Sequence, residues 1–161
     1  MIRNVISEDV VDICRIYNWY VSQTIISFEE TLVSADEMQQ RIQDITSQGF
    51  PWIVVEQEGN LAGYAYASKW RPRPAYKNTV EATVYLDQKF LGMGLGKNLY
   101  TEVLRQLKEA GYHSVMGVIA LPNEASVRLH EKMGFEKAAH FKEVGFKFNQ
   151  WIDVGYWQKM L

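Results

Sequence analysis

Cysteine is almost absent from this sequence: Cys14 is the one cysteine among 161 residues, so no internal disulfide can form. It lies in an amphipathic pattern, which favours a buried thiol in a reducing compartment over a reactive nucleophile. No apolar run is long enough to cross a bilayer, and residues 1–7 do not have the basic-then-apolar pattern of a signal segment. We therefore expect a cytoplasmic protein with no membrane partner.

The chain also lacks a strong excess of charge. A formal net charge of −2 gives no overall cationic field, which argues against a nucleic-acid partner but still allows a local basic pocket. No cluster of His, Cys and Asp has metal-ligand spacing, so no metal is expected. Repeats and linkers are absent, and the length suits a single domain over residues 1–161.

The remaining pattern is a succession of strands and helices. Residues 7–9 supply an N-cap and an acidic first turn for the first helix, and Ser34 with Glu37 predicts a capping box for the second. Two prolines favour a loop at residues 71–78. Strands are predicted at residues 1–6, 52–57, 61–70, 79–87, 114–121 and, as a pair, within 135–161, and helices at 10–20, 34–45, 95–111 and 123–133. This order predicts an α/β fold, a mixed sheet with helices on both faces.

The most informative stretch is residues 79–100, in which an apolar strand runs into a glycine turn and the turn opens a helix. Its glycines are Gly92, Gly94 and Gly96. A helix that starts at about Leu95 aims unpaired backbone N–H groups and the positive end of its dipole at one point, where a phosphorylated ligand fits. Glycine allows close approach of amides to a pyrophosphate and tolerates the positive φ that such a turn needs.

Two other phosphate-binding motifs do not fit this turn. Lys97 stands where a dinucleotide-binding fingerprint needs its third glycine, and the following strand ends at residues 120–122 without an acidic residue. Asn98 stands where a P-loop needs serine or threonine. Taken alone, the turn could also be a tight strand-to-helix connection without a ligand, so other features must decide.

The element order, with a glycine turn after the fourth strand, resembles the GNAT superfamily of acetyl-CoA-dependent N-acetyltransferases, whose turn reads (Q/R)-x-x-G-x-(G/A). Gly94 and Gly96 take the two small positions, and Leu91 stands at the Gln/Arg position. A second family signature, N-x-x-[AS]-x-x-x-Y-x-x-x-G-[FY], matches residues 123–135 with His130 in place of the tyrosine. The resemblance implies a GNAT-like, mostly antiparallel sheet and acetyl-CoA as the acetyl donor.

The likeness to one subfamily covers nearly the whole chain. The segments TVEATVYL, GLGKNLY, SVRLHEKMGF and GFKFNQWIDVGYWQ resemble phosphinothricin and methionine sulfoximine N-acetyltransferases. The cofactor-binding residues that this resemblance implies are Val84, Tyr85 and Leu86 along the pantetheine, Gly92, Met93, Gly94, Leu95, Gly96 and Lys97 around the pyrophosphate, and Asn123 and Ser126 near the thioester. The implied amino-acid pocket is lined by Arg71, Pro72, Arg73, Glu81, Ala82 and Thr83. The family also implies a homodimer.

Acetyl transfer to an amine needs an unprotonated amine, a stabilised oxyanion and a proton for the departing thiolate. Glu81 lies in an otherwise apolar strand and is either a solvated residue or a carboxylate turned into a pocket, where it would be the base; the subfamily match favours the pocket. His130 stands at the acid position of the family. It is a candidate for protonating the thiolate or for the amine-deprotonating path, or it is an exposed helix histidine without a role.

Arg71 and Arg73 are either ordinary loop charges or, beside a pocket for a zwitterion, a clamp for its carboxylate, and the sequence does not say which of them binds it. Phe28 and Glu29 are weaker candidates for a lid over the pocket. Core or dimer contacts are expected of Trp70, Trp151 and Trp157.

We predict an acetyl-CoA-dependent enzyme that acetylates the α-amino group of a small glutamate- or glutamine-like amino acid. Transfer is direct, in a ternary complex, because the chain offers no credible nucleophile. One alternative is another amine, such as a polyamine, an aminoglycoside or a protein N-terminus; a polycationic acceptor would want an acidic pocket, which Arg71 and Arg73 oppose. The other is a non-catalytic acyl-CoA-binding module, which would need neither Glu81 nor His130.

Overall fold

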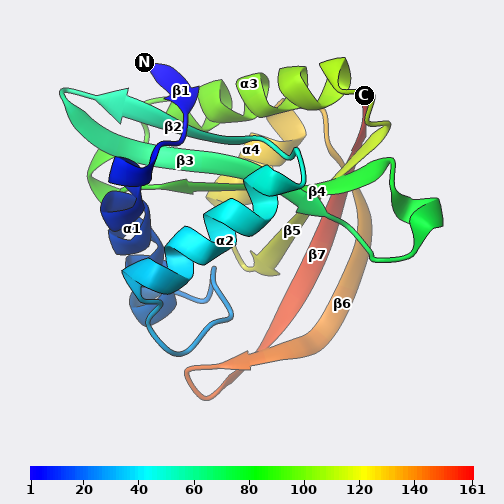
Figure 1. Cartoon of the computed structure of the whole chain (residues 1–161). Coiled ribbons are helices and arrows are strands. Elements are labelled where there is room, and N and C mark those ends of the chain that lie inside the picture. The colour runs from blue at the N-terminus through cyan, green and yellow to red at the C-terminus, as the bar shows by residue number, and fades with distance from the viewer.

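The computed structural model describes residues 1–161, which form one seven-stranded sheet with helices on both faces (Figure 1). The strand order is β1-β2-β3-β4-β5-β7-β6, and β4 and β5 are the only parallel neighbours. The strands are β1 (Ile2–Asn4), β2 (Trp52–Gln57), β3 (Asn60–Lys69), β4 (Thr79–Leu86), β5 (Ser114–Leu121), β6 (Glu136–Lys147) and β7 (Gln150–Met160). The predicted mixed, mostly antiparallel α/β fold is therefore confirmed.

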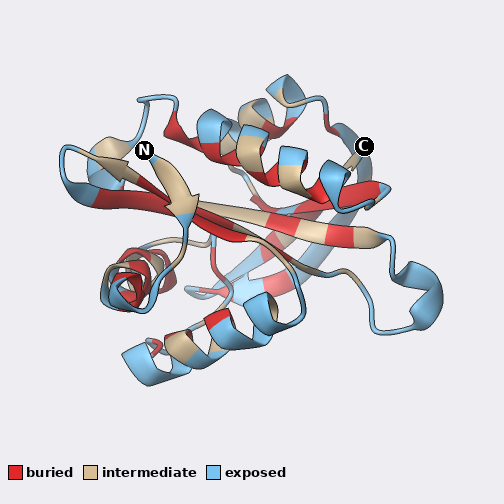
Figure 2. Ribbon diagram, turned by 45° about the horizontal axis from the view of Figure 1, so that its top comes forward, coloured by how far each residue is buried: buried red, intermediate tan, exposed pale blue.

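The helices divide into two pairs. They are α1 (Val10–Gln23), α2 (Ala35–Ser47), α3 (Leu95–Glu109) and α4 (Glu124–Lys132). Figure 2 shows α1 and α2 on one face of the sheet and α3 and α4 on the other, with the buried residues of each helix turned toward the strands. Helices α1, α2 and α3 thus bury apolar residues, as the spacing of their hydrophobic residues predicts, whereas the buried residue of α4 is His130. None of the helices is both long and apolar enough to cross a membrane.

Side-chain alternation along β4 assigns its residues to these two faces. Val80 and Ala82 pack in the same core as α3, whereas Tyr64 of β3 packs in the core of α1 and α2. In β4, Tyr85 pairs with Tyr64, so its side chain lies on the same face as that of Tyr64. Thr83 and Glu81 are two and four positions before Tyr85 and share that face. Because alternate residues point to opposite faces, Glu81 and Thr83 lie on the side of α1 and α2.

The sheet opens between β4 and β5. These strands pair only from Thr79 with Ser114 to Glu81 with Met116. Beyond that point β4 continues along β3 and β5 continues along β7. The facing edges of the two strands are therefore left without strand partners, and their backbone N–H and C=O groups can bind a ligand.

Both predicted N-terminal helix caps need correction. Residues 7–9 form a 3₁₀ turn rather than a capped helix start, and the carboxylate of Asp9 accepts from the Ile6 N–H at 2.8 Å while Arg3 holds it. At α2, Ser34 Oγ accepts from the Glu37 N–H at 3.1 Å, but the Glu37 carboxylate accepts from Arg41 instead of returning to Ser34. Half of the predicted capping box forms, because an arginine one turn away is the stronger donor.

The loop at residues 71–78 contains a short 3₁₀ turn, Pro74–Tyr76, which the sequence did not predict. Proline occupies its first position, where the missing N–H leaves no bond unmade. The first strand is shorter than predicted, at Ile2–Asn4 instead of residues 1–6. Strands β2 and β5 have the predicted bounds, and the other boundaries agree or differ by at most three residues, close to the usual uncertainty of element ends.

Candidate active site

A small cavity of about 70 Å³ lies where β4 and β5 diverge. Strand β4 bounds one side, β5 and α4 bound the other, and one residue each comes from α3 and from the connection between α1 and α2. Its lining residues are Ile26, Ala82, Thr83, Val84, Tyr85, Tyr100, Val118, Ile119, Ala120, Asn123, Ser126 and His130. Residues predicted for the cofactor and residues predicted for the amino acid thus surround one opening.

Glu81 is half-buried at the last β4–β5 pair, directly before this opening. Burial raises the pKa of its carboxyl group, and the positive charge of Arg71 opposes that rise. A carboxylate with a raised pKa holds an accepted proton more tightly, which suits a base. Glu81 is therefore partly shielded from solvent beside the opening, and its role as a base stays a prediction.

The two loop arginines have different surroundings. The Arg71 guanidinium stacks 4.3 Å from the centroid of the Trp70 ring and donates to the Trp70 carbonyl at 3.4 Å. Its charge reaches Glu81, and it forms no ion pair. Arg71, Pro72 and Arg73 are all exposed, and Arg73, which also forms no ion pair, precedes the 3₁₀ turn without an orienting contact. Arg71 is therefore the arginine that is oriented near Glu81 and free to receive an anion.

The glycine turn has the conformation that an anion site requires. Gly92 and Gly94 have φ values of +79° and +78°, and a Cβ at either position would meet nothing within 4 Å. The first helical hydrogen bond runs from the Asn98 N–H to the Gly94 carbonyl at 3.2 Å. The preceding amides of α3 are those of Leu95, Gly96 and Lys97, and they have no acceptor inside the helix. The turn therefore presents free N–H groups next to open space.

Gly96 differs from the other two glycines. It is buried, and a Cβ there would lie 3.2 Å from Leu129 Cδ2 and 3.5 Å from Leu86 Cδ1. This glycine permits close packing of α3 against α4 in addition to offering its amide. Met93 and Lys97, by contrast, are exposed on the turn.

His130 is buried and both of its ring nitrogens are hydrogen-bonded. Nδ1 lies 2.7 Å from the Ser126 carbonyl oxygen and must donate to it, so Nε2 accepts from the Tyr100 hydroxyl at 2.6 Å. Burial lowers the pKa of His130, which keeps the imidazole neutral near pH 7. The ring also packs on Gly117, where a Cβ would lie 2.5 Å from Nε2. The interpretation of His130 as an exposed helix residue is wrong.

Asn123 caps α4: its Oδ1 accepts from the Ser126 N–H at 3.2 Å. Its Nδ2 group donates to no protein acceptor and remains available at the cavity wall. The Tyr85 ring packs against Tyr20 and Tyr64, with centroids 5.0 and 5.6 Å away. The backbone of Tyr85 is thus the part that can line the opening, as the predicted pantetheine contact requires.

Sequence reasoning missed five residues at this cavity: Ile26, Tyr100 and the β5 residues Val118, Ile119 and Ala120. Tyr100 belongs to the buried stripe of α3, and its hydroxyl also lies 3.4 Å from the Ala82 carbonyl oxygen. A tyrosine among leucines and valines was the available signal, because a buried hydroxyl needs a polar partner. No comparable signal marked Ile26.

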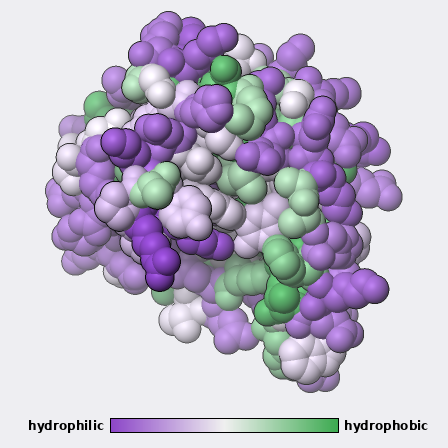
Figure 3. All heavy atoms as spheres, turned by 90° about the vertical axis from the view of Figure 1, so that its right-hand side faces the viewer, coloured by the Kyte–Doolittle hydropathy of each residue, from purple (hydrophilic) through white to green (hydrophobic).

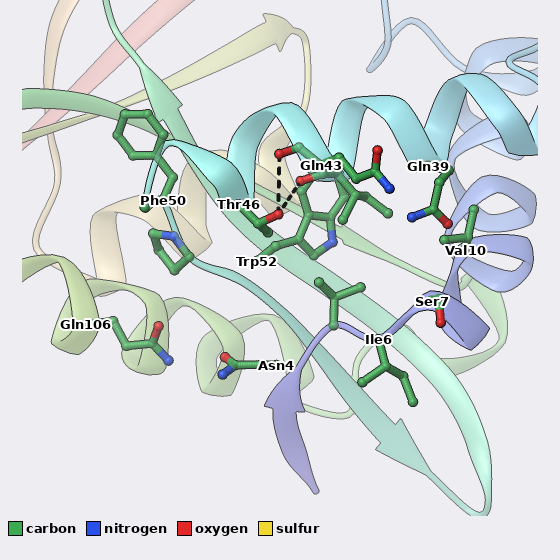
Figure 4. A pocket seen from close by; sticks show the side chains of 14 residues that line it. Asn4, Ile6, Ser7, Val10, Gln39, Gln43, Thr46, Phe50, Trp52 and Gln106 are labelled. Carbon is green, nitrogen blue, oxygen red and sulfur yellow. Dashed lines mark hydrogen bonds between the residues drawn. The ribbon is translucent and has the colours of Figure 1, made fainter.

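A larger cavity, of about 490 Å³, lies elsewhere, between α2, the segment after β1 and the start of β2 (Figure 4). Its labelled side chains include Gln39, Gln43, Trp52 and, from α3, Gln106. No charged residue and no sequence-predicted site residue lines it. We place the candidate active site at the smaller cavity, because strand edges without partners and a buried imidazole converge there, next to the half-buried carboxyl group of Glu81.

The sequence matches the family described as acetyltransferase (GNAT) domain over residues 2–155. The chain belongs to the GNAT acetyltransferase family. It is 38% identical to a phosphinothricin N-acetyltransferase of Streptomyces viridochromogenes, over 98% of this chain and 86% of that protein. It is 32% identical to an L-methionine sulfoximine/L-methionine sulfone acetyltransferase of Salmonella typhimurium, over 99% and 94% of the two chains.

Solved structures agree with this assignment. A phosphinothricin acetyltransferase from Sinorhizobium meliloti in complex with AcCoA superimposes with a TM-score of 0.97 at 34% identity, covering 100% of this chain and 88% of that one. A ribosomal-protein-alanine N-acetyltransferase from Brucella melitensis gives a TM-score of 0.98 at 34% identity, covering 100% and 99%. This GNAT protein is an acetyl-CoA-dependent N-acetyltransferase.

The residues present suit acetyl-CoA, which supplies an activated acetyl group when it is bound. The open glycine turn with free amides fits a pyrophosphate, and the unpaired edges of β4 and β5 fit an extended chain that carries amide groups. No group of three or more His, Cys, Asp and Glu residues is arranged to hold a metal ion.

Proposed function

We propose that this enzyme acetylates the α-amino group of a small glutamate- or glutamine-like amino acid of the phosphinothricin, methionine sulfoximine or methionine sulfone type. The observation that carries the proposal is the pairing of an oriented arginine that lacks an ion pair, Arg71, with the half-buried carboxyl of Glu81. A zwitterion offers a carboxylate to the first and an ammonium to the second. The names of the relatives support the same substrates.

Acetylation of this kind would protect a cell from a toxic amino-acid analogue, so we propose that the enzyme gives its cell resistance to such analogues. We also propose a cytoplasmic location, which suits the reduced, buried thiol of Cys14.

For the acetyl donor we propose three groups of contacts. The amides of the turn from Gly92 to Lys97 bind the pyrophosphate, helped by the positive end of α3. The β4 edge from Val84 to Leu86 bonds the pantetheine. Asn123 Nδ2 and Ser126 lie at the end of the opening next to His130 and orient the thioester.

For the acceptor we propose that Glu81 takes the ammonium proton, directly or through water. Because the Nε2 lone pair of His130 is engaged by Tyr100, His130 acts through that hydroxyl. The Tyr100 O–H turns from Nε2 toward the opening and gives its proton to the thiolate as the C–S bond breaks, and the phenolate that remains takes a proton back from water. His130, whose Nε2 carries no proton, orients the Tyr100 hydroxyl, while the Ser126 carbonyl holds the imidazole in place.

A thiol-release assay over a panel of amines tests the proposed substrate. The panel contains methionine sulfoximine, methionine sulfone, phosphinothricin, glutamate, the decarboxylated amine of each, a polyamine, an aminoglycoside and a peptide that begins with alanine. The proposal expects the amino acids to have the highest kcat/KM. Preference for the peptide would contradict it and favour protein N-terminal acetylation, the activity named for the Brucella structure.

Arg71→Ala should raise the amino-acid KM by about tenfold or more, because a lost charge-assisted bidentate pair costs roughly 1.5–3 kcal/mol. The acetyl-CoA KM should not change. Arg73→Ala is the matched control, since Arg73 has the same charge two residues away but no orienting contact, and it should have the smaller effect. The measurement compares each amino acid with its decarboxylated amine; an Arg71→Ala enzyme that discriminates between them as the parent does would exclude the carboxylate contact.

We further propose a homodimer that uses the end of the β6–β7 hairpin. Exposed hydrophobic residues gather there: Phe141, Val144, Phe146, Phe148 and Trp151. In Figure 3 hydrophobic side chains cluster in the lower right, at the height of this hairpin end in Figure 1. Contiguous aromatic surface of this kind is typical of an interface.

Trp151→Glu should weaken the dimer by at least about tenfold, since aromatic anchors of an interface often contribute 2 kcal/mol or more. Sedimentation velocity over a dilution series measures the monomer fraction. Val11→Glu is the control, because Val11 is exposed to a similar degree, 69% against 66%, but lies on α1. A parent protein that is monomeric at micromolar concentration would refute the dimer.

A further inference from the structure

Lys147 is a buried lysine that the chemistry described above does not use. It ends β6 and is 2% exposed. Its Nζ donates to the carbonyl oxygens of Val21 at 2.7 Å, Thr24 at 2.8 Å and Ser27 at 2.6 Å. An ammonium group has three N–H donors, so all of them are used.

Backbone dipoles, rather than a carboxylate, compensate this charge. Val21 lies in the last turn of α1 and Thr24 follows that helix as its C-cap, so two of the three acceptors belong to the negative end of a helix. Burial lowers the pKa of Lys147, and the more distant charges of Glu30 and Glu29 oppose this. A buried cation without an ion pair is costly to hold, and its cost is met only by a complete set of hydrogen bonds.

The segment that Lys147 holds is the connection between α1 and α2, residues 24–34, here named the cleft loop. Ile26 of this loop lines the cavity between β4 and β5. Phe28 packs on the same strand as Lys147, since a Cβ on Gly145 would lie 2.6 Å from Phe28 Cζ. Strand β6 therefore contacts the cleft loop at two neighbouring positions of one face.

The other side of the cleft loop is tied to the helices. The hydroxyl groups of Ser27 and Tyr17 lie 2.9 Å apart, and the Glu29 carboxylate accepts from Arg41 at 2.6 Å. Without Lys147 these contacts would still attach the loop to α1 and α2, but nothing charged would attach it to β6. The Lys147 bonds are the hydrogen bonds that fix the loop relative to β6, beside the packing of Phe28 on Gly145.

We propose that Lys147 is a positioning residue of the amino-acid site: its ammonium group binds the cleft loop to β6 and thereby holds Ile26 against the opening between β4 and β5. The role of Lys147 in substrate binding rests on the proposed function. The glycine turn precedes α3 on the opposite face of the sheet, so displacement of the cleft loop leaves the pyrophosphate contacts of acetyl-CoA intact.

Lys147→Met tests this by keeping the length of the side chain and removing its donors. The amino-acid KM should rise by about tenfold or more, because buried carbonyls lose charge-assisted bonds, while the acetyl-CoA KM stays at the parental value. Lys147→Gln, which retains two donors, should fall between Lys147→Met and the parent. The control is Lys142→Met, since Lys142 is exposed on the same strand, and it should behave as the parent does.

Hydrogen exchange of residues 24–34 without substrate gives a second readout that does not depend on the reaction. These amides should exchange faster in Lys147→Met than in the parent and in Lys142→Met. If the parent acetylates no amino acid, the proposed function fails while the exchange result still decides whether Lys147 holds the loop. Parental exchange together with a parental amino-acid KM would overturn the proposal.

If Lys147→Met does not fold, Gly145→Ala carries the test. Its Cβ would press on the Phe28 ring and displace the cleft loop without removing a Lys147 hydrogen bond. As for Lys147→Met, we expect a raised amino-acid KM and an unchanged acetyl-CoA KM. A folded Gly145→Ala enzyme in which residues 24–34 exchange faster but both KM values are parental would show that the position of the loop does not matter to the substrate.

Discussion

Glu81→Gln should lower kcat by roughly 10²–10⁴-fold at saturating acetyl-CoA, the usual effect of losing a general base. At neutral pH the α-amino group of an amino acid arrives mostly as ammonium, and it attacks only after a proton has left. Glutamine keeps the shape of the side chain and cannot accept that proton. The measurement is kcat and kcat/KM of parent and variant from acid to alkaline pH.

The pH dependence has a definite sign. Glu81 must be ionised to act, and burial raises the pKa of its carboxyl group. The acid limb of the parental kcat/KM profile should therefore lie at higher pH than an ordinary glutamate would give, with the rate rising as pH rises. In Glu81→Gln this limb should disappear, and only the titration of the substrate amine should remain.

Stability should change in the opposite direction from activity. A folded-state pKa above the unfolded value means that ionisation of Glu81 opposes folding, and this cost appears as pH rises through the raised pKa. Glutamine does not ionise, so Glu81→Gln should have a Tm at neutral pH no lower than that of the parent. Loss of kcat without loss of Tm separates a chemical role from a structural one.

His130→Phe is the comparison for this experiment. It should cost less than Glu81→Gln, because a thiolate is a tolerable leaving group and the imidazole acts through Tyr100. A Glu81→Gln enzyme with near-parental kcat and an unchanged profile would exclude Glu81 as the base. A much larger defect in His130→Phe would transfer that role to His130.

The fold could be predicted from local signals. Apolar periodicity, the glycine turn and the prolines of residues 71–78 located the strands and helices within a few residues. The helix caps were less predictable, since Arg3 and Arg41 reach across turns to take the carboxylates of Asp9 and Glu37. A short motif records which residues can form a cap, but not which donors compete for them.

The candidate site was predictable where a motif runs along the chain and not where it depends on contacts across the fold. Our proposal of Arg71 over Arg73 rests on the stacking of Arg71 on Trp70, which the sequence does not show. The state of His130 needed Tyr100, thirty positions away on another helix. The burial and the hydrogen bonds of Lys147 could not be predicted for the same reason, because its three acceptors lie more than a hundred residues earlier in the chain.

Gly94→Val should reduce acetyl-CoA affinity by about 100-fold or more. A branched residue forced into the left-handed region costs roughly 1–2 kcal/mol, and displacing the turn amides from a phosphate forfeits charge-assisted bonds of about 1.5–3 kcal/mol. Gly94 has φ +78° and precedes the first residue of α3, so any adjustment of its backbone moves the amides that follow. The Cβ would also enter the open space in which a pyrophosphate must lie.

Strain alone must be separated from loss of the anion site, and the chain offers a matched control. Gly59 has φ +75° in the β2–β3 turn, and a Cβ there also meets nothing within 4 Å. Gly59→Val should therefore lose similar stability but bind acetyl-CoA as the parent does. Gly96 is unsuitable for this test because its Cβ would press on Leu129.

Calorimetric titration of the folded variants with acetyl-CoA is the measurement. Equal affinities for Gly94→Val and Gly59→Val would mean that the glycine turn does not bind the cofactor, whereas a selective loss in Gly94→Val ties cofactor binding to the amides of residues 92–97.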